Sequence, residues 1–125
     1  MTDYKSVKFF LEALEKHSKV QQCWHVPDDE ESILRIERTD GMSTVTVYLA
    51  DAYDFSVGEY MCRSRRIGRG DFILVSGFRP DVDSATIEFA RKDGIGVGNL
   101  RRLMGALNWS NVWEYLSPEE RGVKH

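Results

Sequence analysis

The sequence contains the run Ser32-Ile33-Leu34-Arg35-Ile36-Glu37-Arg38-Thr39-Asp40-Gly41, followed by Thr44-Val45-Thr46-Val47-Tyr48-Leu49-Ala50. Apolar and polar residues alternate along both runs, which is the period of a strand with one buried face. Asp40-Gly41 between them is a strong turn signal. We therefore predict an antiparallel hairpin formed by residues 33–39 and 43–50.

The chain after the hairpin predicts parallel strands. Phe72-Ile73-Leu74-Val75 is a continuous apolar run, as expected of a strand covered on both faces. We predict a short strand at 95–97 and a β-α-β unit that places 72–76 beside the second hairpin strand. The helix between these strands runs to Lys92, with Asp81 or Asp83 as N-cap, and we expect it to bury Val82, Ala85, Phe89 and Ala90.

Helices are predicted on either side of these strands. Residues 4–19 have an amphipathic pattern with Asp3 as N-cap, whereas residues 20–31 are predicted to be irregular. A helix is expected at 57–67, and a turn or two of helix at 110–117. The helix that Asn99 caps has its apolar face at Leu100, Leu103, Met104 and Leu107. The fold class is thus α/β with a mixed sheet of four or five strands, in the order helix–hairpin–helix–β–α–β–α.

Size and composition fit one globular domain over residues 1–125. Apolar residues make up 42% of the chain and aromatic residues 11%. No apolar run approaches the roughly 18 residues that cross a bilayer, and the N-terminus lacks the pattern of a signal peptide. We therefore expect a cytoplasmic protein without a membrane partner, whose Cys23 and Cys62 are reduced.

The net charge of −3 conceals an asymmetry between the two halves. Residues 1–60 contain 12 acidic and 6 basic residues, whereas residues 61–125 contain 8 acidic and 11 basic ones, nine of them arginine. This balance argues against broad affinity for nucleic acid but leaves room for a local basic patch.

The order of elements, together with the sequence at 70–78, 93–97 and 99–104, resembles the restriction-endonuclease-like superfamily, the PD-(D/E)xK nucleases, and in particular Mrr-type restriction enzymes. The resemblance covers about residues 30–108. It implies an acid on one hairpin strand and Asp or Glu, any residue and Lys on the next, where the acids hold Mg²⁺ and the lysine activates water.

This chain departs from that pattern. The first acid is expected near Ser32 and the second motif within residues 46–50, but neither an acid nor a lysine is found there, and no lysine occurs between Lys19 and Lys92. The resemblance therefore implies a degenerate member with no catalytic residues and no cofactor. If the site has migrated and the chain is a Mg²⁺-dependent nuclease, its candidate acids are Glu31, Glu37, Asp51 and Asp54.

The candidate nucleic-acid-binding residues are the arginines of the second half, because guanidinium groups suit bidentate phosphate contacts. If the helix at 57–67 continues, positions 63 and 66 share a face, as do 65 and 69. The alternative is a helix end whose charges pair with the acids of the first half. The candidates are Arg63, Arg65, Arg66, Arg69, Arg101 and Arg102.

For three further motifs we favour a structural role over a functional one. Cys23-Trp24-His25 lacks the paired spacing of a zinc site, so no metal is expected. Gly94, Gly96 and Gly98 alternate with apolar residues, which indicates close backbone packing rather than a phosphate loop. Trp109 and Trp113 either close the core or, if exposed, form a surface for a protein partner or homodimer.

We therefore expect a non-catalytic binding or regulatory domain that contacts nucleic acid or a protein partner through an arginine-rich surface. The alternatives are the metal-dependent nuclease with a migrated site and a small interaction module that uses its acidic first half.

Overall fold

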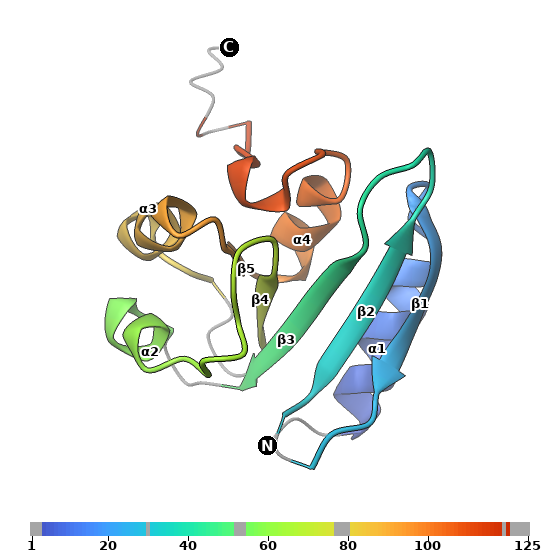
Figure 1. The fold of residues 1–125 in the computed structure, drawn as a ribbon, viewed down its shortest axis with the longest axis horizontal. Coiled ribbons are helices and arrows are strands. Elements are labelled where there is room, and N and C mark those ends of the chain that lie inside the picture. Colours follow the sequence, from blue (N-terminus) through green and yellow to red (C-terminus); the bar gives the residue numbers. More distant parts are fainter. Residues whose placement is uncertain (1–3, 30, 52–54, 77–80, 119, 121–125) are drawn as a thin grey trace.

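The computed structural model describes residues 4–29, 31–51, 55–76, 81–118 and 120 (Figure 1). Within these ranges the chain forms the elements α1 (Tyr4–Glu15), β1 (Val20–Val26), β2 (Ile33–Arg38), β3 (Val45–Asp51), α2 (Val57–Met61), β4 (Phe72–Ser76), α3 (Ser84–Lys92), β5 (Gly96–Gly98), α4 (Leu100–Ala106) and the 3₁₀ turn η1 (Val112–Glu114). None of the described helices is long and apolar enough to cross a membrane.

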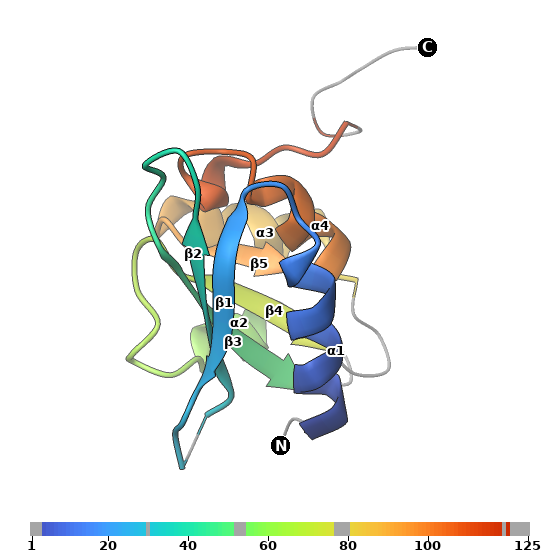
Figure 2. The ribbon, with the colours of Figure 1, turned by 90° about the vertical axis from the view of Figure 1, so that its right-hand side faces the viewer.

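The strands form one mixed sheet in the order β1-β2-β3-β4-β5. β2 and β3 pair antiparallel, with Ile33 opposite Tyr48 and Ile36 opposite Val45, so the predicted hairpin is confirmed. β4 pairs parallel with β3, and β5 pairs parallel with β4, which confirms the predicted β-α-β unit. The sheet is strongly twisted, since β1 stands upright in Figure 2 whereas β4 runs across the view.

The prediction of irregular structure at 20–31 is wrong for residues 20–26, because β1 pairs antiparallel with β2 from Val20 to Val26. β1 lies at the edge of the sheet and has exposed residues along its length, so its sequence lacks the apolar run that would mark a strand. The cross-strand partner of Trp24 is Arg35, and both side chains are exposed. The fold therefore has one strand more than the predicted order of elements.

Helices cover both faces of the sheet and create two cores (Figure 1). On one face, α1 and α4 pack their apolar residues on β2, β3 and β4, with Leu14, Leu34 and Phe72 fully buried. On the other, α2 and α3 cover the C-terminal part of the sheet around Tyr60 and Ile73. The predicted apolar face of α4 is confirmed for Leu103 and Leu107, which are buried, and Asn99 caps the helix as expected.

Two helices differ from their predicted extents. α1 ends at Glu15 rather than at residue 19, and its predicted cap Asp3 lies outside the described residues. α2 ends at Met61 rather than at 67, because the chain turns so that both Tyr60 and Ile67 enter the second core.

α3 begins at Ser84 with Asp83 as its cap, and its buried face differs from the predicted one. Ala90 is buried, but Ala85 is exposed and Phe89 is 40% exposed. Thr86, which the prediction did not place in the core, is fully buried instead.

Candidate functional site

Two of the arginines after α2 are engaged within the molecule. The Arg63 guanidinium lies 4.2 Å from the centre of the Tyr60 ring and 3.8 Å from the Asp93 carboxylate. Arg66 Nη1 lies 2.5 Å from Asp28 and 3.1 Å from Glu31, which belong to the acidic first half of the chain. Ion pairs within the molecule thus take up much of the charge expected of a phosphate-binding patch.

The other two arginines of this group differ from each other. The Arg69 guanidinium stacks 4.9 Å from the centre of the Trp113 ring. Arg65 is exposed and has no hydrogen-bond or ion-pair partner among the residues that the structure describes. Because α2 ends at Met61, the helix does not continue through these four arginines, and the condition for their sharing helical faces is not met.

Arg101 and Arg102 lie at the opposite end of the sheet from this loop. The loop arginines precede the first residue of β4, whereas Arg101 follows the last residue of β5, and these strands run parallel. The six candidate arginines therefore form two separate groups rather than one surface.

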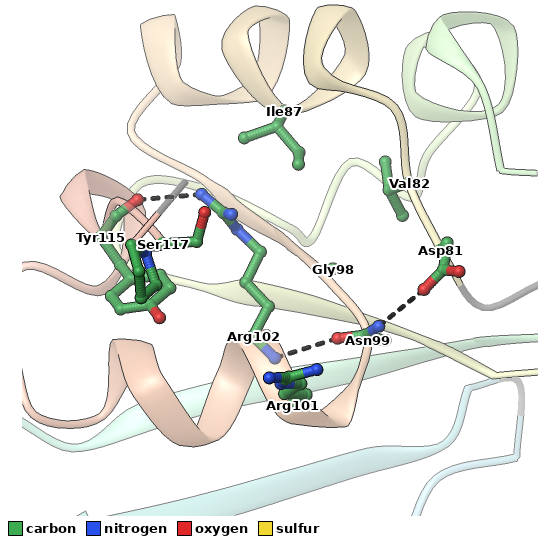
Figure 3. A pocket seen from close by; sticks show the side chains of 10 residues that line it. Asp81, Val82, Ile87, Gly98, Asn99, Arg101, Arg102, Tyr115 and Ser117 are labelled. Atoms are coloured by element: carbon green, nitrogen blue, oxygen red, sulfur yellow. Dashed lines mark hydrogen bonds between the residues drawn. The ribbon is translucent and has the colours of Figure 1, made fainter. Parts of the chain in front are cut away.

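The second group lines a cavity of about 330 Å³ at the carboxyl end of β5 (Figure 3). Outside the carboxyl ends of parallel strands is where ligands bind in open α/β sheets. Val82 and Ile87 give the cavity an apolar side, whereas Asp81, Asn99 and the arginines of α4 give it a polar one. Its lining consists of Asp81, Val82, Ile87, Gly98, Asn99, Arg101, Arg102, Tyr115, Ser117 and Pro118.

Hydrogen bonds fix the polar side of the cavity. Asn99 accepts a hydrogen bond from the Arg102 backbone N–H at 2.9 Å and donates one to the Asp81 carboxylate, also at 2.9 Å (Figure 3). Arg101 is exposed at the cavity and has no hydrogen-bond or ion-pair partner within the described part of the chain. Its charge is available to an anionic ligand.

Arg102 is held by the segment that follows α4. Its guanidinium donates to the Tyr115 carbonyl oxygen at 2.9 Å and to Glu120 Oε1 at 2.5 Å. Burial by itself would raise the pKa of Glu120, but the hydrogen bonds from Arg102 and Ser117 outweigh it and lower that pKa to about 2. Glu120 therefore carries a full negative charge at neutral pH.

Sequence reasoning missed the residues that surround Arg102. Arg91, Tyr115 and Glu120 contact it or share its partners, yet Arg91 belongs to α3 whereas Tyr115 and Glu120 follow η1. No local pattern marks them, since Arg91 resembles any basic residue in the last turn of a helix.

Among the hairpin positions at which the nuclease residues were expected, Ser32 and Thr46 are half-buried, whereas Ile33 and Tyr48 are buried. Ile33 and Tyr48 are cross-strand partners and pack in the second core. The Tyr48 hydroxyl donates to the Arg66 carbonyl oxygen at 3.4 Å, and burial raises its pKa, so it remains a neutral phenol.

The acids of the migrated-site alternative do not form one cluster. Glu31 precedes β2 and pairs with Arg66, whereas Glu37 lies near the other end of β2 and accepts a hydrogen bond from Gln22. Asp51 ends β3, and Asp54 lies outside the described residues. In the described ranges, no group of three or more His, Cys, Asp or Glu side chains is placed to hold a metal ion.

The remaining motifs have structural roles. Cys23 and Cys62 are both free thiols. Gly96 lies against the Phe72 ring, which accords with the close packing expected of the glycine run. Trp109 makes an edge contact with the Tyr115 ring, and Trp113 lies partly buried against the first core, so both indoles are engaged within the molecule.

No family model matches this sequence, and no curated protein or solved structure matches the chain. The arrangement itself offers a cavity of about 330 Å³ lined by apolar side chains from Val82 and Ile87 and by the charged groups of Arg101, Arg102 and Asp81. Such a cavity can bind a ligand that combines an apolar ring with a phosphate or carboxylate.

Proposed function

We propose that this chain is a non-catalytic nucleic-acid-binding domain with a degenerate restriction-endonuclease-like core. The observation that carries the proposal is the cavity at the carboxyl end of β5, where Arg101 is exposed and unpartnered among the described residues. A cavity of about 330 Å³ is at the small end of ligand sites and suits one nucleotide that projects from its strand.

The degenerate core is supported by the hairpin β2–β3 with β4 parallel beside it, followed by α3, β5 and α4. This is the order of elements that the resemblance implies. The loss of catalysis is supported by Ile33 and Tyr48, which fill with hydrophobic packing the hairpin face where a metal site would need carboxylates.

Nucleic acid is favoured over a protein partner by the shape and chemistry of this site. Protein interfaces are built on broad surfaces with an apolar centre. Here Val82 and Ile87 offer a small apolar wall opposite Asn99 and Arg101, which suits a base on one side and a phosphate on the other.

A salt titration with matched variants tests the proposal. Fluorescently labelled single-stranded DNA and RNA are titrated with the protein at several salt concentrations. Each neutralised phosphate of a single strand contributes about −0.7 to the slope of log K against log salt, so Arg101→Ala should reduce the slope by roughly 0.7. Arg65→Ala, which removes an exposed and unpartnered arginine at the other end of the sheet, should leave the slope unchanged.

Two results would contradict this proposal. Absence of binding at low salt would rule out nucleic acid, and a slope reduced only by Arg65→Ala would move the site to the loop arginines.

Catalysis is tested separately with Mg²⁺ and Mn²⁺ on single- and double-stranded substrates, where we expect no cleavage. Cleavage that disappears in Glu37→Ala or Asp51→Ala would establish the nuclease with a migrated site instead.

A further inference from the structure

Two arginines from different helices meet at one carboxylate beside the cavity. Arg102 of α4 lies 2.5 Å from Glu120 Oε1, and Arg91 of α3 lies 3.6 Å from Glu120 Oε2. The Arg102 and Arg91 side chains are only 13% and 19% exposed, and that of Glu120 is 24% exposed. The three groups therefore interact in a partly desolvated place, where charge interactions are stronger than on an open surface.

The two guanidinium groups are held in position independently of Glu120. Both donate to the Tyr115 carbonyl oxygen, Arg102 at 2.9 Å and Arg91 at 3.2 Å. Arg91 also donates to the Trp113 carbonyl oxygen at 3.2 Å, and it forms an ion pair with Glu88 one turn earlier in α3. If the Glu120 carboxylate were withdrawn, the arginines would keep these contacts and present two oriented donor groups.

A carboxylate that bridges two arginines stands where a phosphate group would bind. Guanidinium groups recognise carboxylates and phosphates with the same fork of N–H donors, and a phosphate monoester offers more oxygen atoms and more charge. Without Glu120 the cluster of Arg91, Arg102 and Glu88 has a net charge of +1, and Arg101 adds a further positive charge at the adjoining cavity.

We propose that Arg91 and Arg102 form a subsite for the terminal phosphate of a nucleic-acid strand, which Glu120 occupies as an internal competitor until the ligand displaces it. This inference rests on the proposed function for the identity of the ligand. A terminal phosphate is favoured over an internal one because α3, α4 and residues 112–118 enclose the arginines, whose side chains are only 13% and 19% exposed. An internal phosphate would have to bring chain in on both sides.

The variant that tests the subsite is Glu120→Gln, which keeps the shape of the side chain and removes its charge. The matched control is Glu114→Gln, since Glu114 accepts a hydrogen bond from Asn111 and lies in no ion pair among the described residues. Inorganic pyrophosphate is the first probe, and its binding is measured by calorimetry at low salt. We expect Glu120→Gln to bind it about tenfold more tightly than the unaltered protein, and Glu114→Gln to bind it equally well.

The second probe separates a strand end from free phosphate. Single-stranded oligonucleotides with and without a 5′-phosphate are compared, and we expect the phosphorylated strand to bind more tightly by several-fold in Glu120→Gln. Arg102→Lys in the Glu120→Gln background should remove this preference, because one ammonium group cannot replace the guanidinium fork. Circular dichroism confirms that each variant is folded.

The outcomes distinguish the two proposals. If the unaltered protein binds nucleic acid but Glu120→Gln gains no affinity for pyrophosphate or phosphorylated strands, the subsite is refuted and the proposed function stands. If Glu120→Gln binds pyrophosphate more tightly while no form binds nucleic acid, the arginine pair is a phosphate site but its assignment to strand ends is refuted together with the proposed function.

Discussion

The guanidinium of Arg38 lies 3.1 Å from the carbonyl oxygen of Leu107, so the end of β2 is tied to the end of α4 across 69 residues of sequence. The same side chain donates to the carbonyl oxygens of Trp109 and Ser110 and to the backbone and hydroxyl oxygens of Ser43. Arg38 is only 3% exposed and forms no ion pair among the described residues. It satisfies carbonyl groups at a helix end, which otherwise lack partners.

Replacing Arg38 should therefore destabilise the protein strongly. Arg38→Met removes the donor from the buried carbonyl oxygen of Leu107 and from three partly buried carbonyl oxygens, and we expect the free energy of unfolding to fall by about 3 kcal/mol. Arg35→Met is the matched control, because Arg35 lies on the same strand with its side chain exposed, and it should change stability by less than about 0.5 kcal/mol. Urea unfolding followed by circular dichroism measures both. Equal losses in the two variants would contradict a special role for Arg38.

A second stability prediction concerns the close approach of β5 to β4. Phe72 pairs with Gly96, and a Cβ atom at position 96 would lie 2.5 Å from Cδ2 of the buried Phe72 ring. Gly96→Ala should lower the free energy of unfolding by about 1–3 kcal/mol, because a packed core does not yield to added volume without strain.

Gly68→Ala provides the control for this prediction. Nothing lies within 4 Å of a Cβ atom at position 68, and the φ angle there is not positive. This substitution should be neutral or stabilise the protein by up to about 1 kcal/mol, since alanine restricts the unfolded chain. Thermal unfolding measures the stability of both variants. A Gly96→Ala protein as stable as Gly68→Ala would show that the Phe72 ring can move aside.

The parts of the fold that could be predicted are those with a strong periodic pattern. The hairpin follows from alternation and an Asp-Gly turn, and β4 follows from its continuous apolar run, because burial of apolar residues determines both. β1 could not be predicted, since an edge strand carries many polar residues and its sequence does not alternate between apolar and polar residues. The end of α2 depends on how Ile67 packs in the second core, and the local sequence does not contain that information.

The arginines illustrate why the site was harder to predict than the fold. Their type and number are visible in the sequence, but their partners come from distant segments, as with Arg66 and Asp28, which are 38 residues apart. The pairing of arginines with first-half acids was one of the alternatives, and it describes Arg66. The cavity beside Arg101 is assembled from the segment before α3, α3 itself, α4 and the segment after η1, so only the folded chain reveals it.

The two cysteines should differ in reactivity. Burial raises the pKa of Cys23, with a further contribution from the charge of Glu15, whereas Cys62 is exposed at the end of α2. Because the thiolate is the reactive form, Ellman's reagent should modify Cys62 quickly and Cys23 slowly. Cys62→Ser should abolish the fast phase, and the rate at Cys23 should keep rising with pH beyond the range of an ordinary thiol. A single fast phase in Cys62→Ser would contradict this assignment.

The ion pair of Arg102 and Glu120 predicts a specific loss of stability in acid. The pKa of Glu120 is lowered to about 2 in the folded protein, below the ordinary value for glutamate of about 4.3, so the folded state binds this proton more weakly than the unfolded state. The contribution of this ion pair to the free energy of unfolding is therefore complete above about pH 5 and decreases as the pH falls toward 2.

Urea unfolding measures this effect in the unaltered protein and in Glu120→Gln. The difference between their free energies of unfolding should be constant between pH 7 and 5, and it should narrow at pH 4 and further at pH 3. Glu114 has no arginine partner among the described residues, so Glu114→Gln should follow the unaltered protein throughout this range. If the difference between the unaltered protein and Glu120→Gln did not narrow in acid, Glu120 would not be held by the arginines. The same Glu120→Gln protein would then also fail to gain affinity for pyrophosphate, because both effects depend on one carboxylate placed between Arg91 and Arg102.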